Sequence, residues 1–153
     1  MSQISSESRR VSALAKMAFK AQIFLLRRNW MGPAGNIIMI ITTIGRKSGK
    51  AFTTPIGYQW DGDTVLTFNV GRTSNWYKNL AQNPLVTLEI KKKTYKMRAA
   101  YVTDTQEIRQ ILELYKCEQT SALPRFFGVP ADSSGDDLMK AADKVGFVRF
   151  SAV

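Results

Sequence analysis

The sequence contains no histidine and only one cysteine, Cys117. A single cysteine cannot form an internal disulfide, and without histidine or a cysteine pair the usual zinc sites are excluded. The lack of histidine also removes the commonest general base and the Ser-His and Cys-His nucleophile pairs. If the chain is an enzyme, we therefore expect a bound cofactor to supply the chemistry, and we expect no metal site.

Long apolar segments are missing as well. No run of residues approaches the roughly 18 apolar positions that span a bilayer, and the first ten residues, MSQISSESRR, lack the apolar core of a secretory signal. We therefore expect the protein in the cytoplasm. Its 153 residues, 44% of them hydrophobic, suffice for one core. The sequence thus predicts a single domain over residues 1–153.

Carboxylates are absent from a long part of the chain. No Asp or Glu lies between Glu7 and Asp61, whereas nine Lys or Arg residues do. Residues 1–100 hold sixteen cations against four carboxylates, and residues 101–153 hold six against eight. This asymmetry predicts an anionic partner for the first part of the chain: nucleic acid, an acidic membrane surface or a phosphate-bearing small molecule.

Hydrophobic periodicity predicts the elements that would carry such a site. Residues 52–60 alternate in polarity, Pro55 indicates a sheet edge or a bulge, and Asp61-Gly62 is a hairpin signal that should pair this strand with 64–69. Further strands are predicted at 37–44, 86–90, 95–102 and 145–152, and helices at 5–28, 74–83, 104–119 and 138–144. About six mainly antiparallel strands with peripheral helices indicate an α+β domain built on a small β-barrel. We divide it into an N-terminal helix (1–30), a barrel core (36–103) and a closing helix, loop and strand (104–153).

The predicted N-terminal helix, which Ser5 or Ser6 would cap, is amphipathic. Apolar residues recur at helical spacing from Val11 to Leu26, and a second, basic stripe consists of Arg9, Lys16, Lys20 and Arg27. We predict that the apolar face covers one end of the barrel, because amphipathicity is the ordinary state of a surface helix. The alternative is a peripheral contact with anionic lipid at the inner face of a membrane.

Two motifs carry the functional prediction, and the first is the turn GRKSGK. Arg46 offers a forked guanidinium, Lys47 a mobile charge and Ser48 a hydroxyl. Gly45 and Gly49 let backbone N–H groups approach a ligand closely. This combination suits a phosphate or a polycarboxylate. It is not a Walker P-loop, because a strand instead of a helix follows, and a solvated hairpin turn is the alternative interpretation.

The second motif is NVGRTSNWYKNLAQNPLV, residues 69–86. Gly71 and Arg72 form another backbone and cation site, Ser74 opens a helix whose positive end can face an anion, and Trp76 supplies flat apolar surface. The order of a strand, TTIGRKSG, a strand with a central proline, the DGD hairpin and WYKNLAQNPLV resembles the deazaflavin-dependent nitroreductase and quinone reductase family. This family belongs to the split β-barrel flavin and deazaflavin oxidoreductases, and the resemblance covers residues 37–103.

The resemblance implies a split β-barrel of the FMN-binding type and the coenzyme F-420, an 8-hydroxy-5-deazaflavin with a phosphate and an acidic tail. In the family, the Arg-Lys-Ser turn binds that tail, the proline-containing strand lies along the ring, and the loop before the short helix contacts the ribityl phosphate region. The cofactor-binding residues that this implies are Arg46, Lys47, Ser48, Gly49, Thr54, Pro55, Ile56, Gly57, Val70, Gly71, Asn75, Trp76 and Asn79. Phe52 stands where relatives often have a further arginine, which weakens the tail site unless Lys50 or Arg72 substitutes.

The activity that the resemblance implies is hydride transfer from the reduced coenzyme to an electron-poor acceptor such as a quinone, an enone or a nitro compound. Two alternatives stay open: an FMN-dependent reductase of the same fold, and a non-catalytic flavin- or deazaflavin-binding protein. The resemblance assigns no catalytic residue. Tyr115 is a candidate proton donor, although a tyrosine on an amphipathic helix is more often part of the core. The following loop, with Phe126 and Phe127, does not resemble the family.

The expected partner is therefore a small-molecule electron acceptor. Nucleic acid is not expected, because Lys91, Lys92 and Lys93 are typical of a solvated hairpin turn and no recognition motif accompanies them. Many split-barrel proteins are dimers, so the resemblance leaves a homodimer open.

Overall fold

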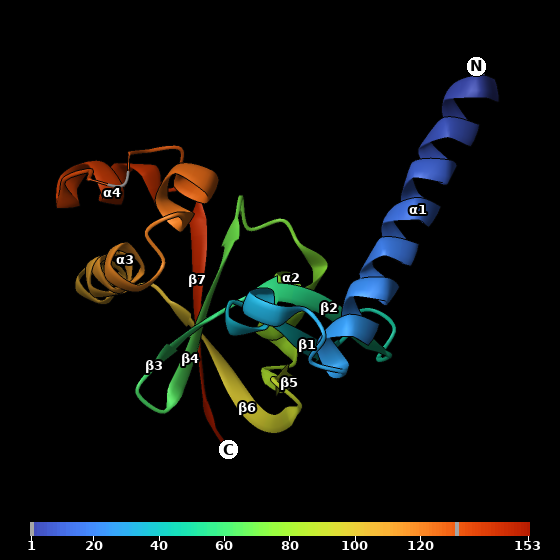
Figure 1. Cartoon of the computed structure of the whole chain (residues 1–153), viewed down its shortest axis with the longest axis horizontal. Helices are drawn as coiled ribbons and strands as arrows, with labels where there is room; N and C mark the ends of the chain where they lie inside the picture. Colours follow the sequence, from blue (N-terminus) through green and yellow to red (C-terminus); the bar gives the residue numbers. More distant parts are fainter. Residues whose placement is uncertain (1, 131) are drawn as a thin grey trace.

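One curled antiparallel sheet organises the fold. The computed structural model describes residues 2–130 and 132–153, with side chains from Ala13 onward. Within these residues, seven strands form the sheet in the order β2-β1-β5-β6-β7-β4-β3, and Figure 1 shows how it curls. The strands are β1 (Ile38–Ile44), β2 (Ala51–Gly57), β3 (Gln59–Asp61), β4 (Thr64–Val70), β5 (Leu85–Ile90), β6 (Lys93–Val102) and β7 (Val145–Ala152).

The sheet has one strand more than predicted, because the strand expected at 52–60 divides at Tyr58. Its first part, β2, pairs with β1, and its second part, β3, pairs with β4 at the opposite edge of the sheet. The prediction that the whole strand pairs with 64–69 is therefore wrong for all but Gln59–Asp61. Tyr58 leaves both ladders: its backbone N–H donates to Ile37 O at 2.9 Å and its Oη donates to Gly35 O at 3.1 Å.

The two sheet edges meet without closing. No ladder joins β2 to β3 among the described strands, so the barrel is split at this point. The edges are linked by the chain itself and by the hydroxyl of Thr67, which donates to Gly57 O at 2.7 Å. Pro55 lies in β2, an edge strand, as its missing N–H predicts.

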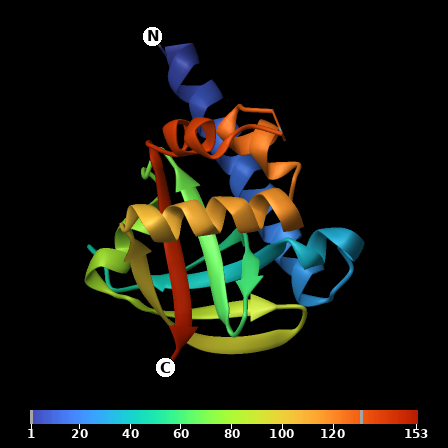
Figure 2. The same cartoon turned by 90° about the vertical axis from the view of Figure 1, so that its left-hand side faces the viewer.

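Alternation along the strands gives the sheet two apolar faces. Val65 and Phe150 point into the inner core, which the side chains of Trp76 and Leu80 complete from α2 (Asn75–Gln82). On the outer face, Leu66 and neighbouring residues pack against three further segments: α3 (Thr105–Glu118), a π-helical turn (Leu123–Phe127) and α4 (Gly135–Ala141). Figure 2 shows α3 lying across β7 and β4. The predicted helices at 74–83 and 104–119 are confirmed, and the one at 138–144 begins three residues earlier.

The N-terminal helix does not cover the barrel. Helix α1 (Ser2–Arg27) leads through a 3-10 turn (Gly32–Asn36) into β1, and Figures 1 and 2 show it extending away from the sheet. Residues 13–20 are all exposed, whereas Leu26 is 7% exposed. The predicted packing of its apolar face on the barrel is therefore wrong for residues 13–20, because the helix axis diverges from the sheet before its last turn. Since α1 already begins at Ser2, Ser5 or Ser6 does not start it, and the side chains of both lie outside the described residues.

Candidate cofactor and acceptor site

A cleft of about 420 Å³ opens beside the edge strand β2. Its walls come from β2, the end of β4, the first turn of α2, and the segment from the end of α3 to the π-helical turn, with Gln22 of α1 and the start of β1 beside them. Most of the lining is apolar or aromatic, as is usual for cofactor and small-molecule sites. Among the thirteen residues predicted to bind the cofactor, those that line this cleft are Pro55, Ile56, Gly57, Val70 and Trp76.

Tyr115 lines the cleft and carries a buried polar atom without a partner. Its side chain is 1% exposed, and its ring meets that of Phe68 edge-on, 5.3 Å between centroids. The Oη atom has no hydrogen-bond partner among the described residues. Burial raises the pKa of Tyr115 well above the ordinary value of 10.0, so the hydroxyl stays protonated at neutral pH. An unpaired buried hydroxyl is unfavourable, and an oxygen atom of a ligand in the cleft would satisfy it.

The turn that follows β1 is attached to α2. The backbone N–H and the Nη1 of Arg46 both donate to Oδ1 of Asn79, at 3.2 and 2.9 Å, and Nη2 donates to Oδ1 of Asn75 at 3.4 Å. Asn79 is 2% exposed, and its Nδ2 donates to Oγ1 of Thr43 at 3.2 Å. Asn79 thus joins β1, the turn and α2. The guanidinium is held beside the helical turn that places Trp76 in the cleft.

The remaining residues of the turn are exposed. The Oγ of Ser48 accepts a hydrogen bond from the backbone N–H of Lys50 at 3.2 Å, and Gly49 has a φ of +70°, which favours glycine. Lys47 and Lys50 make no ion pair with the residues that the structure describes. Two cations therefore stand free beside the held guanidinium of Arg46.

Phe52, in place of the expected arginine, covers the backbone of the turn. A Cβ atom built on Gly45 would lie 2.7 Å from the Phe52 ring and 2.8 Å from Ser48 Oγ, so a side chain at this position would have to displace the ring and the serine hydroxyl. Arg72 does not replace the missing cation. Its Nη2 donates to the carbonyl oxygens of Asp143 and Val145 at 3.0 and 3.2 Å, near the start of β7.

Two predicted cofactor residues lie neither in the cleft lining nor at the Arg46 turn. Thr54 stands opposite Ile41 in the β1–β2 ladder. Gly71 has a φ of +80°, and its backbone N–H already donates to Lys144 O at 2.9 Å. The structure therefore brings the predicted residues together in two groups, one along the cleft and one at the Arg46 turn.

A reciprocal pair of hydrogen bonds fixes the loop between β4 and α2. Ser74 occupies the predicted N-cap position, but its side chain makes no capping bond. Instead, Asn69 Nδ2 donates to Ser74 Oγ at 2.8 Å, and the Ser74 backbone N–H donates to Asn69 Oδ1 at 3.1 Å. This pair holds Val70 and Trp76 on the same wall of the cleft.

Sequence reasoning missed the wall that follows α3. Gln119 Nε2 donates to Tyr58 O and to Gln59 Oε1, each at 2.8 Å, and so ties the end of α3 to the split in the barrel. Phe126 lines the cleft, with its ring 5.4 Å from that of Phe68 and the Arg125 guanidinium 5.3 Å above it. The signal was the aromatic pair in LPRFFG, since two large rings in a loop need an apolar surface to pack on.

Comparison with known proteins identifies the family. A family model described as F420H(2)-dependent quinone reductase matches residues 16–121, which is more than half of the chain. The chain belongs to this family. Its coenzyme is accordingly the deazaflavin F-420, and the F420H(2)-dependent quinone reductases are oxidoreductases, as the sequence motifs predicted.

Solved structures share the fold. An F420-H2 dependent reductase, FDR-A, superposes with a TM-score of 0.53 at 17% identity, over 74% of this chain and 93% of its own. An FAD-binding protein from Mesorhizobium loti gives 0.51 at 12% identity, over 77% and 82% of the two chains. A structure described as a domain-swapped dimer gives 0.54 at 13% identity, over 95% and 99%. At these identities the likeness shows an α+β split-barrel fold.

The residues in and beside the cleft fit the coenzyme of the family. A flat ring needs an apolar wall, which Pro55, Ile56 and Trp76 provide. An anionic tail needs cations that are not already paired, and the Arg46 turn provides them. The unpaired hydroxyl of Tyr115 leaves a hydrogen-bond donor for a bound oxygen atom.

Proposed function

We propose that this F420H(2)-dependent quinone reductase family member reduces an electron-poor acceptor, with a quinone as the first candidate and enones and nitro compounds as the others. The observation that carries the proposal is the cleft in which the Pro55 strand, Trp76 and the unpaired hydroxyl of Tyr115 meet. The coenzyme supplies the hydride chemistry when bound, so the chain needs no histidine or protein nucleophile.

The Arg46 turn would bind the anionic tail of the coenzyme. Asn75 and Asn79 already orient the guanidinium, so less side-chain freedom is lost on binding than for a free arginine. A guanidinium also binds phosphate or carboxylate oxygens through two parallel hydrogen bonds. Lys47 and Ser48 would complete this part of the site with a charge and a hydroxyl. The backbone N–H groups of Gly45 and Gly49 already donate within the turn, to Lys50 O at 2.8 Å and to Gly45 O at 3.0 Å, so the contribution of Gly49 would be its lack of a side chain.

The strand β2 would lie along the ring. Because β2 is an edge strand, one row of its backbone N–H and C=O groups is unpaired and can hydrogen-bond the polar edge of the ring. We assign this contact to the segment from Thr54 to Gly57. Val70, Gly71 and Trp76 would contact the region between ring and tail from the opposite wall.

Tyr115 would hold the acceptor. Its neutral phenol would donate a hydrogen bond to a carbonyl or nitro oxygen and so orient the acceptor. Addition of a hydride converts a quinone into the hydroquinone mono-anion, and addition of a proton then gives the neutral hydroquinone. The hydrogen bond of Tyr115 would stabilise the oxygen on which the negative charge develops. Replacing Tyr115 by Phe should lower kcat and leave coenzyme affinity unchanged. Equal kcat values for the parent and for Tyr115→Phe would show that Tyr115 does not act on the acceptor.

Fluorescence titration of the purified protein with coenzyme F-420 and with FMN tests the cofactor site. Arg46→Ala should weaken F-420 binding by about tenfold or more, since hydrogen bonds to charged groups contribute about 1.5–3 kcal/mol. Lys96→Ala removes an exposed cation on β6 and serves as the matched control. Binding of FMN alone would overturn the proposal.

Turnover separates an enzyme from a cofactor carrier. Oxidation of the reduced coenzyme is followed with menadione as the quinone and with a nitroaromatic compound as the second acceptor. We expect menadione to be the better acceptor. Tight binding of F-420 without turnover of either compound would favour the non-catalytic alternative.

We further propose a homodimer, supported by the structural neighbour described as a domain-swapped dimer. Light scattering on the purified chain gives the mass directly. A monomer at all accessible concentrations would exclude this assembly.

A further inference from the structure

The exposed face of α1 and the cations beside it have no part in the site proposed above. We propose that this end of the molecule docks on the surface of an anionic phospholipid bilayer, with α1 lying in the interface. None of the described helices is long and apolar enough to cross a membrane. The docking does not depend on the proposed reaction, although it would bring the cleft close to lipophilic acceptors.

An apolar stripe runs along α1 on the side away from the barrel. Leu14, Met17, Ala21 and Phe24 follow one another at intervals of three, four and three residues, which places them on one helix face. Leu14 is 65%, Met17 66% and Phe24 50% exposed. The burial of Leu26, with partial burial of Gln22, Ile23 and Leu25, marks a different face, centred near Leu26, as the one toward the barrel. The Phe24 ring meets that of Trp30 edge-on, 6.0 Å between centroids, but packing within the described residues does not account for the exposure of Leu14 and Met17.

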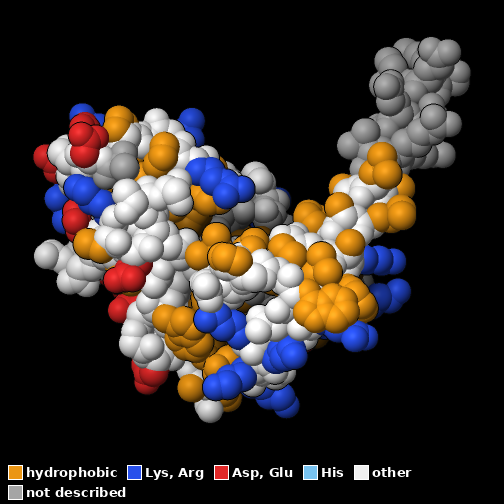
Figure 3. All heavy atoms as spheres, viewed as in Figure 1, with side chains coloured by type: hydrophobic (Ala, Val, Ile, Leu, Met, Phe, Trp, Pro, Cys, Tyr) orange, Lys and Arg blue, Asp and Glu red, His pale blue; other side chains and the backbone are white. Residues whose placement is uncertain are grey.

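Cations flank this stripe. Lys16, Lys20 and Arg27, spaced by four and seven residues, share the adjoining face of the helix. The Arg28 guanidinium lies 4.9 Å from the centre of the Phe24 ring and 5.4 Å from that of Trp30, which is 63% exposed. Figure 3 shows hydrophobic side chains along the described part of α1, with Lys and Arg beside them. An apolar face with cationic flanks is the pattern of a helix that lies in a membrane interface.

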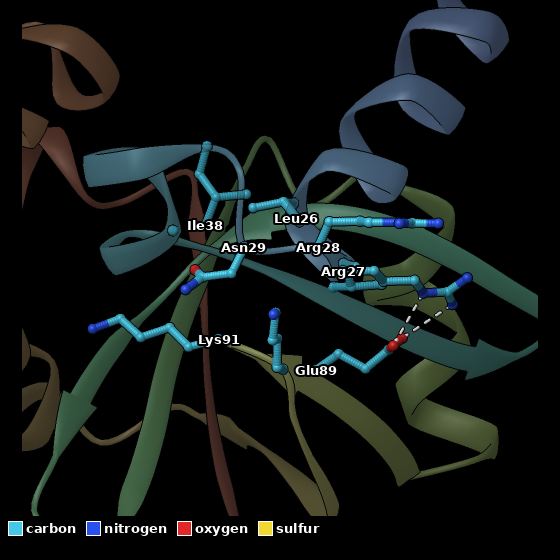
Figure 4. A pocket seen from close by; sticks show the side chains of 10 residues that line it. Leu26, Arg27, Arg28, Asn29, Ile38, Glu89 and Lys91 are labelled. Atoms are coloured by element: carbon cyan, nitrogen blue, oxygen red, sulfur yellow. Dashed lines mark hydrogen bonds and ion pairs between the residues drawn. The ribbon is translucent and has the colours of Figure 1, made fainter.

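A cationic hollow of about 470 Å³ continues this surface at the end of α1. Leu26, Ile38 and Ile40 contribute apolar lining, and its cations are Arg27, Arg28, Lys91 and Lys92. Figure 4 shows Arg27 reaching the carboxylate of Glu89, with contacts of 3.0 and 3.1 Å. Glu89 is the one acidic residue in the lining and is thereby neutralised, so the other three cations are free to bind a phosphate.

The turn between β5 and β6 keeps lysines where they are disfavoured. Lys91 and Lys92 have φ values of 48° and 70°, a left-handed conformation that favours Asn-Gly in a two-residue hairpin. Two lysines here therefore carry a conformational cost that Asn-Gly would avoid. Their position in the lining of the hollow gives a reason for it, because both add positive charge beside Arg27 and Arg28 at the end of α1.

An anionic bilayer matches both features at once. Nucleic acid would pair with the cations but would leave Leu14, Met17 and Phe24 in water. A second copy placed symmetrically on the same face would oppose cation to cation. A bilayer surface supplies phosphates for the cations and acyl chains for the stripe.

Co-sedimentation of the full chain with vesicles tests the docking. We expect binding to vesicles of phosphatidylglycerol and phosphatidylcholine in equal parts, and little binding to pure phosphatidylcholine. Leu14→Ser with Met17→Ser, and separately Lys20→Gln with Arg28→Gln, should each reduce binding at least tenfold. Leu85→Ser and Lys96→Gln change an exposed apolar residue and an exposed cation elsewhere and should bind as the parent does.

Each of the following results would overturn the proposal. Equal binding to both vesicle types, or full binding by the Leu14 and Met17 variant, would exclude an apolar face inserted beside anionic headgroups. Competition by inorganic phosphate beyond that of chloride at equal ionic strength would indicate a site for free phosphate instead. If the parent chain does not bind vesicles and is a dimer in light scattering, whereas the Leu14 and Met17 variant is a monomer, the stripe is a contact with a second copy. Circular dichroism of all variants controls for folding.

Discussion

Two buried tyrosines differ in whether their hydroxyl has a partner, and this difference has a measurable consequence. Tyr58 Oη donates to Gly35 O, whereas Tyr115 Oη is unpaired among the described residues. Tyr58→Phe leaves a buried carbonyl without its donor and should lower the free energy of unfolding by about 1–2 kcal/mol. Tyr115→Phe removes an unsatisfied group and should leave stability equal or higher. Urea unfolding of both variants at neutral pH makes the comparison, and a similar loss for both would mean that Tyr115 has a partner in solution.

The raised pKa of Tyr115 makes a second prediction at this scale. Because the folded-state pKa lies above 10.0, the hydroxyl keeps its proton when the unfolded chain loses it, so stability falls as the pH rises past about 10. Tyr115→Phe has no such proton and should reduce this alkaline loss. Unfolding free energies measured near neutral pH and near pH 11 give the difference. An identical pH dependence in parent and variant would contradict the buried, un-ionised state.

Asn79 should act on the coenzyme through Arg46. Its amide oxygen accepts two hydrogen bonds from Arg46, and its nitrogen donates to Thr43. Asn79→Ala should cost about 1–3 kcal/mol of stability, because buried polar partners are left unpaired. It should also weaken F-420 binding, since the guanidinium is then free to rotate. Asn75→Ala, which removes one longer hydrogen bond at 3.4 Å, is the matched control with the smaller expected effect on both measurements. Equal losses of stability and of F-420 affinity in the two variants would show that Asn79 does not orient Arg46 more than Asn75 does.

At the scale of the elements, α2 is fixed on two sides. Asn79 joins it to β1, and the ring of Tyr77 lies on Gly146 of β7, where an added Cβ atom would overlap the ring. Gly146→Ala should therefore destabilise the fold by about 1–3 kcal/mol through overpacking. In a Tyr77→Ala background the same substitution should cost much less, because the clash is gone. Thermal unfolding of the parent, the two single variants and the double variant completes the cycle. Additive losses of stability would mean that the strain does not arise from contact with the Tyr77 ring.

Local signals in the sequence predicted local structure well. The Asp61-Gly62 turn, the edge position of Pro55 and the start of the predicted helix at 104 agree with the structure, in which Asp104 accepts a hydrogen bond from the Glu107 backbone N–H. The division of 52–60 was not predictable in this way. Alternation with a period of two continues through Tyr58, and only the positions of β1 and β4 decide that the strand changes partners there.

The same contrast holds for the candidate site. The turn at Arg46 and the first turn of α2 are adjacent motifs in one resemblance, and hydrogen bonds join them in the structure. The wall at Gln119 and Phe126 comes from a segment outside the resembling region, so only tertiary packing places it at the cleft. For α1, periodicity indicated an apolar face but contained no information on what that face contacts.

At the scale of the whole molecule, acidic and basic side chains lie over different elements. Figure 3 shows acidic side chains over α3 and α4, far from the Lys and Arg residues near α1. The first hundred residues hold sixteen cations and four carboxylates. The cations near α1 therefore produce a positive field at that end of the molecule, which attracts anionic partners there and falls off with added salt.

The divergence of α1 from the barrel predicts how much of the chain the fold needs. Residues 13–20 are exposed, so a chain that begins at Ala21 should unfold with a free energy within about 0.5 kcal/mol of the parent. A chain that begins at Arg28 also loses Leu26, which is 7% exposed, and the ion pair of Arg27 with Glu89. It should lose about 2–5 kcal/mol, mostly from the buried leucine, because an ion pair with an arginine this exposed contributes less than about 1 kcal/mol. Urea unfolding followed by tryptophan fluorescence measures both, and a large loss already on removal of residues 1–20 would mean that the start of α1 packs on the barrel.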